Sequence, residues 1–161
     1  MKAIIFTLVS IAILSTSCNQ NNNSKSTTNV QHEKAAPNTN SVIPYVVAER
    51  YFTKNTVEDA NLTLQITSKN DFDKYFGSAT VMGNDGKPTP IDFSKQYAIT
   101  VIGKKSNNKV NILPLSLESE NNTITLQYKE ETEEKQTHTS RALLILLVDK
   151  KYNGNIKFER K

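Results

Sequence analysis

Apolar and polar residues alternate along much of this 161-residue chain, and this alternation limits its possible folds most. In residues 62–66 every second side chain is apolar, and residues 123–128 repeat the pattern. A period of two is typical of a β-strand with one buried face, because successive side chains of an extended backbone point to opposite sides. The sequence therefore predicts a mainly β domain.

Other apolar runs extend this prediction. Residues 97–102 are apolar on both faces apart from Thr100, which is typical of a central strand. Residues 110–117 change parity, so we expect a kink or bulge near Pro114, at an edge of the sheet. Residues 140–150 and 155–160 are interpreted as a final hairpin, because Asn-Gly at 153–154 is typical of a type I′ turn.

One short helix is predicted after residue 68. Ser68 can cap it, Asp71 stands three residues on, and Gly77 follows as a stop. Phe72, Tyr75 and Phe76 share the face that would lie against the sheet. The expected fold is a single mainly β domain with a minor α component: a mostly antiparallel sheet, one short helix and a C-terminal hairpin over residues 42–161.

The N-terminus has the order of an export signal over residues 1–17. Lys2 precedes an apolar stretch at residues 4–14, which is shorter than the roughly 20 residues that a spanning helix needs. Small residues and then the only cysteine, Cys18, follow directly. This resembles the bacterial lipoprotein signal, although Ser15 stands where that signal usually has an aliphatic residue.

The resemblance implies that Cys18 is the site of lipid attachment, with ordinary secretory cleavage as the alternative. Asn19 follows the cysteine, where aspartate is associated with retention in the inner membrane, so the outer membrane is the expected location. Residues 18–41 are almost purely polar and are predicted to be a disordered tether. His32 lies within this tether and is discounted as a catalytic residue.

Few residues suggest catalysis or metal binding. A single cysteine excludes an internal disulfide and a multi-cysteine zinc site. His138 has no GxSxG motif to accompany it, and Asn-Asp-Gly at 84–86 is interpreted as a simple turn. Asp92 and Asp149 stand beside apolar runs, and each is expected to cap a turn or end a strand. We therefore expect no enzymatic activity, no cofactor and no metal.

The charge pattern indicates a protein partner rather than nucleic acid. The net charge is +4, which is too mild to favour a phosphate backbone. Lys104, Lys105 and Lys109 are interpreted as surrounding a loop, and the acidic residues at 130–134 as a solvated hairpin tip. The basic last hairpin is the candidate partner surface, through Lys150, Lys151, Tyr152 and Arg160.

Residues 60–161 resemble the C-terminal domain of the PrcB family, which is named for a subunit of a bacterial surface protease complex. The similarity lies in residues 66–72, in Ile91-Asp92-Phe93-Ser94-Lys95 and in the apolar strand that ends at Gly103. Residues 103–108 depart from the glycine-rich turn that is common in that family. The resemblance implies a small accessory domain at the cell envelope, with no activity of its own.

Three functions remain open. The first is a lipid-anchored envelope protein that binds another protein, such as a protease. The second is a module that binds a peptide or glycan through tyrosine and phenylalanine. The third is a hydrolase built around Asp92 or Asp149.

Overall fold

The computed structural model describes residues 41–80, 82 and 86–161. The predicted signal segment, Cys18 and the tether up to residue 40 lie outside the described residues, as do Asn84 and Asp85 of the predicted turn. The described elements are β1 (Ser41–Val42), β2 (Val46–Val47), β3 (Tyr51–Thr53), β4 (Leu62–Ile66), α1 (Lys69–Tyr75), β5 (Phe76–Ser78), β6 (Gln96–Glu120), β7 (Thr123–Asp149) and β8 (Asn155–Arg160).

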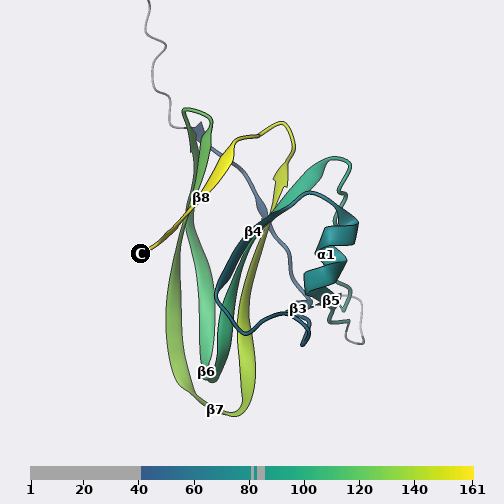
Figure 1. Cartoon of the computed structure of the whole chain (residues 1–161), viewed down its shortest axis with the longest axis vertical. Coiled ribbons are helices and arrows are strands. Elements are labelled where there is room, and N and C mark those ends of the chain that lie inside the picture. The colour runs from purple at the N-terminus through teal and green to yellow at the C-terminus, as the bar shows by residue number, and fades with distance from the viewer. Residues whose placement is uncertain (1–40, 81, 83–85) are drawn as a thin grey trace, which may run out of the picture. The chain divides into compact units, whose positions relative to one another are not determined.

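The long hairpin of β6 and β7 organises the fold. Its turn is Asn121-Asn122, and both residues have positive φ angles, 48° and 62°, as a type I′ turn requires. The pairing shifts abruptly between Ser106↔Ser140 and Asn108↔Lys135, which leaves extra residues in β7. Such bulges bend a strand and increase its twist, and both strands curve sharply at the lower end of Figure 1.

This bend folds the hairpin into two half-sheets that pack against each other. One half-sheet contains β4, residues 96–102 of β6, residues 143–149 of β7, and β2. The other contains β1, the second part of β6, the first part of β7, and β8. The core between them is Ile43, Tyr97, Ile99, Val101, Ile112, Leu117, Ile124, Leu126, Tyr128, Leu144, Leu146 and Val148.

A second core lies on the opposite face of the first half-sheet, where α1 packs (Figure 1). Ala98 and Ile102 alternate with the residues of the first core and meet Phe72 and Phe76 there. Ser68 caps α1 as predicted, because the Asp71 N–H donates to its Oγ at 3.1 Å. The helix ends at Tyr75 and Gly77 lies in β5, so the predicted glycine stop is wrong.

Within the described ranges, the mainly β class, the mostly antiparallel sheet and the one short helix are confirmed. Residues 97–102 are a central strand with β4 on one side and β7 on the other. The pairing shifts between Pro114 and Ser116, where a kink was expected. Among the described residues, no helix has the length and hydrophobicity that a membrane span requires.

The predicted C-terminal hairpin is wrong. β8 does not pair with residues 140–150 but runs parallel to residues 123–128 of β7, in the other half-sheet. Asn153 and Gly154 therefore belong to the segment that connects β7 in one half-sheet to β8 in the other. At Gly154 a Cβ atom would lie 2.7 Å from the Asn122 carbonyl oxygen, which also accepts the Asn155 N–H at 2.9 Å. The glycine allows this close backbone approach.

Two charged segments also differ from expectation. Lys104, Lys105 and Lys109 lie within β6 rather than around a loop. Residues 130–134 lie within β7 rather than at a hairpin tip, and Glu133 pairs with Lys109 at 2.8 Å across the two strands. Ser41, assigned to the tether, pairs with Ser119 in β1. In each case, residues that the sequence pattern places in a loop or tether pair with a strand that is distant in sequence.

Candidate functional site

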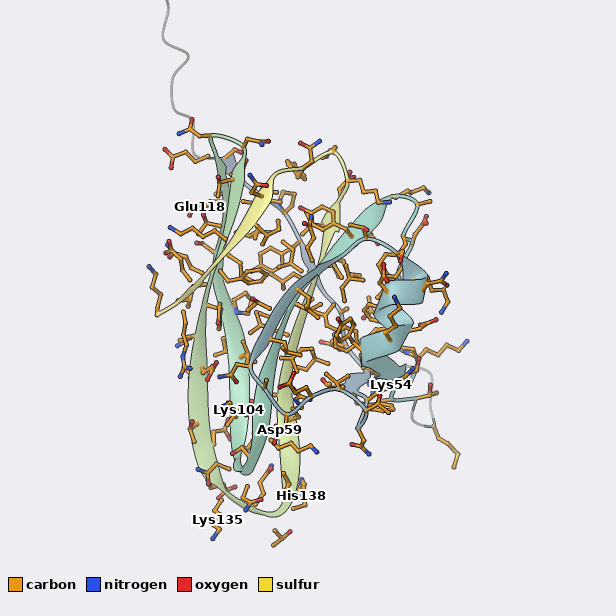
Figure 2. All side chains as sticks on the ribbon, in the orientation of Figure 1. Lys54, Asp59, Lys104, Glu118, Lys135 and His138 are labelled. Carbon is orange, nitrogen blue, oxygen red and sulfur yellow. The ribbon has the colours of Figure 1, made fainter. Side chains whose placement is uncertain are left out.

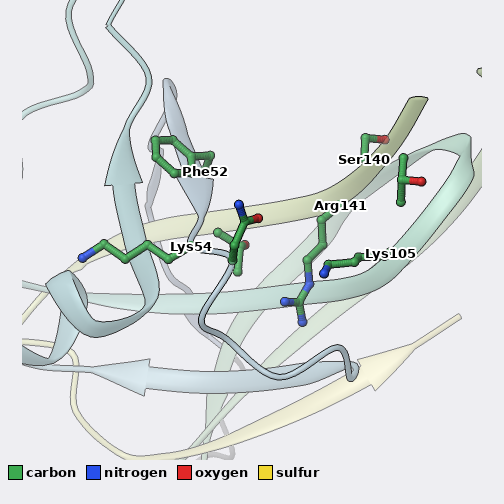
Figure 3. A pocket seen from close by; sticks show the side chains of 8 residues that line it. Phe52, Lys54, Lys105, Ser140 and Arg141 are labelled. Atoms are coloured by element: carbon green, nitrogen blue, oxygen red, sulfur yellow. The ribbon is translucent and has the colours of Figure 1, made fainter. Parts of the chain in front are cut away.

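A cleft of about 620 Å³ opens where the long hairpin bends (Figure 3). Its walls come from the end of β3 and the following residues on one side, and from β6 and β7 on the other. The lining residues are Phe52, Thr53, Lys54, Asn55, Lys105, Thr139, Ser140 and Arg141. Most of them are polar, and three are cationic.

The irregular pairing of β6 and β7 places two of these cations together. Regular pairing stops at Ile102↔Leu143 and resumes, after a shift, at Lys105↔Arg141. Because directly opposed residues of antiparallel strands point to the same face, the Lys105 and Arg141 side chains share one side of the hairpin (Figure 3).

Arg141 fastens the loop between β3 and β4 to this bend. Its Nε donates to the Gly103 carbonyl at 2.7 Å. The terminal nitrogens donate to three loop carbonyls: Nη1 to Val57 at 3.3 Å, and Nη2 to Glu58 at 2.7 Å and Ala60 at 2.8 Å. A guanidinium has five N–H hydrogens, so these four bonds use most of its donors.

Two side chains of the same loop secure it from the other direction. The Lys104 N–H donates to Asn61 Oδ1 at 3.0 Å, and the Lys105 N–H donates to Asp59 Oδ1 at 2.7 Å. β4 stops pairing with β6 at Ile102, so these backbone N–H groups have no strand partner there. The side chains replace the missing strand, and Figure 2 places Asp59 close to Lys104. The loop is thereby a fixed wall.

The cleft carries positive charge. Among its lining residues, all of which the structure describes, none is acidic, and no ion pair joins Lys54, Lys105 or Arg141 to a described carboxylate. The Lys54 ammonium instead contacts the Asp73 carbonyl and points away from Lys105 (Figure 3). Lys105 and Arg141 are therefore two cations of the cleft that form no ion pair with a described carboxylate, although the Asp59 carboxylate accepts the Lys105 backbone N–H.

The three hydroxyl groups among the lining residues differ in their hydrogen bonds. Thr139 donates to Asn107 Oδ1 at 2.7 Å and Ser140 donates to Gln136 Oε1 at 3.0 Å. Thr53 Oγ1 is buried and makes no hydrogen bond with the described residues. Thr139 and Ser140 thus offer oxygen atoms that can accept, whereas the buried Thr53 Oγ1 is not exposed to the open cleft.

The predicted partner residues do not form one cluster. Lys150, Lys151 and Tyr152 lie in the segment before β8, whereas Arg160 ends β8, a six-residue strand about 20 Å long. Lys150 Nζ donates to the Phe93 carbonyl at 2.6 Å, and Lys151 Nζ lies 5.0 Å from the centre of the Tyr152 ring. Arg160 pairs with Glu130 at 3.1 Å, so local contacts engage all four.

Both candidate carboxylates cap turns. Asp92 Oδ1 accepts the Ser94 N–H at 2.9 Å and the Ser94 hydroxyl at 2.6 Å, and these bonds lower the pKa of Asp92. A general acid needs a raised pKa instead. Asp149 Oδ1 accepts the Lys151 N–H at 2.8 Å. The two residues are therefore used as the sequence predicted, in capping.

The remaining candidate, His138, is exposed in the bulge of β7, beside Lys135 at the lower end of Figure 2. Within the described ranges no three histidine, cysteine or acidic residues are grouped so that they could hold a metal ion.

Lys105 and Arg141 were not singled out from the sequence as a site. The sequence predicts a basic loop around Lys105, and Arg141 stands directly before the apolar run 142–148 without a motif around it. An arginine at the border of a buried strand was the available signal. Lys105 and Arg141 lie opposite each other because of the register shift between β6 and β7, and no local sequence pattern predicts that shift.

The fold and the cleft define a small, mainly β protein of two packed half-sheets and one helix, with a cationic cleft at the bend. Comparison of the chain with protein-family models, with curated proteins and with solved structures finds no match in any of the three.

Proposed function

We propose that this protein is a lipid-anchored accessory protein of the cell envelope, which binds another protein and has no catalytic activity of its own. The observation that carries the proposal is the position of Cys18, the only cysteine, directly after the apolar stretch 4–14 and three small residues. The polar run that follows suits a tether between a lipid and a domain.

Lipid attachment at Cys18 would anchor the protein stably, because the contributions of several acyl chains add up. Each buried CH₂ contributes about 0.8 kcal/mol, one acyl chain binds only marginally, and two or more chains bind stably. A flexible linker of 22 residues, from 19 to 40, would span about 25 Å on average, so the domain would stand clear of the lipid surface. The outer membrane is the proposed location.

Metabolic labelling tests the anchor. Cells that express the full chain are grown with labelled palmitate, and we expect label on the purified protein and recovery of the protein in the membrane fraction. Cys18→Ser should abolish both. Ser17→Ala, which keeps a small residue before the cysteine, is the matched control and should retain both. An unlabelled wild-type protein in the cytosol would refute the proposal.

The proposed partner is an envelope protein, with a protease as the leading candidate because of the resemblance to the PrcB family. Mild crosslinking in intact membranes, followed by purification of the full chain, should recover a reproducible partner. Recovery of the protein alone under the same conditions would count against protein binding.

A second function, binding of a peptide or glycan, is favoured by one feature, the cleft at the bend, because clefts with a few placed polar groups are the usual form of ligand sites. A hydrolase built on Asp92 and Asp149 is not proposed, since hydrogen bonds within turns engage both carboxylates.

A further inference from the structure

Two cations face each other in the cleft without a carboxylate between them. Lys105 and Arg141 are opposed across β6 and β7, and no ion pair joins either of them to a described acidic residue. Like charges directly opposed across strands destabilise a sheet. Elsewhere in the same sheet, Lys109 of β6 pairs with Glu133 of β7, and Arg160 of β8 pairs with Glu130 of β7. The two cations of the cleft lack such a partner among the described carboxylates.

Asp59 is an acidic residue of the loop that adjoins the pair, and its carboxylate is already engaged. Its Oδ1 accepts the backbone N–H of Lys105, not the ammonium group. From the same loop, Glu58 offers its backbone carbonyl to Arg141 rather than its carboxylate. An anion that enters the cleft would therefore meet two cations without first displacing an ion pair.

The remaining donors favour a carboxylate over a phosphate. Four bonds to carbonyls use the Arg141 guanidinium, so it supplies charge but cannot clamp a phosphate with two parallel N–H groups. The ammonium of Lys105 makes no hydrogen bond with the described residues, and the Asn55 amide lies within the same cleft. One ammonium and one amide suffice for a single carboxylate group.

The opposite wall adds an apolar contact. Phe52 is 50% exposed although it is a large aromatic residue, and it lines the cleft across from Lys105 and Arg141 (Figure 3). A ligand that fills this cleft would thus place a carboxylate near Lys105 and an apolar group on the Phe52 ring. A polypeptide with an acidic residue beside an apolar one combines these two features.

We propose that this cleft binds an acidic peptide segment of a partner protein, with Lys105 in direct contact with a carboxylate, Arg141 as the fixed second charge, and Phe52 against the neighbouring apolar side chain. This inference rests on the proposed protein-binding function, for which it names the surface and the chemistry of the partner segment.

The test uses the full chain, purified from membranes in neutral detergent, and a fluorescent peptide that contains Glu-Phe-Glu between glycine and serine residues. Binding is followed by fluorescence anisotropy. We expect the peptide to bind and an equivalent Gln-Phe-Gln peptide not to bind. Raising the salt from about 0.05 to about 0.3 M should weaken binding, because the contact is ionic and exposed to solvent.

Matched variants locate the contact. Lys105→Gln should weaken binding by about fivefold, the effect of losing an ion pair worth about 1 kcal/mol. Lys104→Gln makes the same charge change one residue away, at a side chain that does not line the cleft, and should change the affinity by less than about twofold. Both lysines are exposed, so neither change should disturb folding.

Three results would overturn the inference: equal binding of the two peptides, no binding of either, or equal losses for Lys104→Gln and Lys105→Gln. Competition distinguishes the ligand chemistry further. If inorganic phosphate displaces the bound peptide and succinate does not, the cleft is a phosphate site and the proposal of an acidic peptide is refuted. If Lys105→Gln leaves the membrane crosslink to a partner intact, the cleft inference fails while the proposed function stands.

Discussion

At the scale of single residues, Arg141 makes four long-range hydrogen bonds beside the cleft. It bonds to carbonyls at residues 57, 58 and 60 of one loop and to Gly103 of β6, positions far from it in sequence. Hydrogen bonds from a charged donor contribute more to stability than neutral ones. Arg141 therefore holds the wall of the cleft as well as supplying charge.

Arg141→Lys should show this structural role. Lysine keeps the charge, but its single ammonium group cannot bond to all four carbonyls as the planar guanidinium does. The free energy of unfolding should therefore fall by about 2 kcal/mol in urea titrations. The control is Arg160→Lys, which changes an exposed ion pair with Glu130 and should cost less than about 0.5 kcal/mol. Equal effects of the two substitutions would contradict this role.

At the scale of elements, β8 is held by parallel pairing with the start of β7, and its first residue meets the turn of the long hairpin. The Asn155 N–H donates to the Asn122 carbonyl, and Gly154 lies against the same carbonyl with no room for a Cβ atom. The position of β8 therefore depends on a backbone-to-backbone contact beside the Asn121-Asn122 turn.

Gly154→Ala should disturb this contact. The added methyl group would lie 2.7 Å from the Asn122 carbonyl oxygen, so β8 must shift, and we expect a loss of about 1–3 kcal/mol in the free energy of unfolding. Amide hydrogen exchange of β8 should increase most. Asn153→Ala, at the exposed neighbouring position, should leave both unchanged, and an equally stable Gly154→Ala protein would show that β8 docks in another way.

At the scale of the whole described domain, two connections link the half-sheets in addition to the bent strands β6 and β7. Residues 150–154 form one of them, between β7 and β8, and the segment between β1 and β2 forms the other. In the segment between β1 and β2, the Ile43 N–H donates to the Leu117 carbonyl in one half-sheet, and directly after β2 the Ala48 N–H donates to the Ile145 carbonyl in the other. The Ile43 side chain is fully buried in the core between them. It helps to hold the two half-sheets together.

Ile43→Ala should lower the free energy of unfolding by about 2–4 kcal/mol, because it leaves a cavity between the half-sheets. Thermal unfolding followed by circular dichroism should show a single transition at a lower temperature. Val42→Ala is the control, since Val42 is 75% exposed, and it should change stability by less than about 0.5 kcal/mol. A loss as small as that of Val42→Ala would mean that the half-sheets close without Ile43.

Local signals predicted most of the elements correctly. The period of two in residues 62–66 and 123–128 corresponds to β4 and the start of β7, and Ser68 caps α1 through a bond to a residue three positions away. The hairpin turn was missed, because Asn121-Asn122 lacks the usual glycine. The Asn-Gly pair at 153–154 predicts a hairpin turn, but the strands on its two sides do not pair with each other.

The amino-acid sequence alone determined the mainly β class, the helix start and the capping use of Asp92 and Asp149, because each depends on residues within a few positions of one another. Only the tertiary structure decided the bend of the long hairpin, the crossover of β8 and the cationic cleft. Lys105 and Arg141 are 36 positions apart, and they meet because a register shift arises where two strands pair and fold over a shared core. No local pattern carries that information.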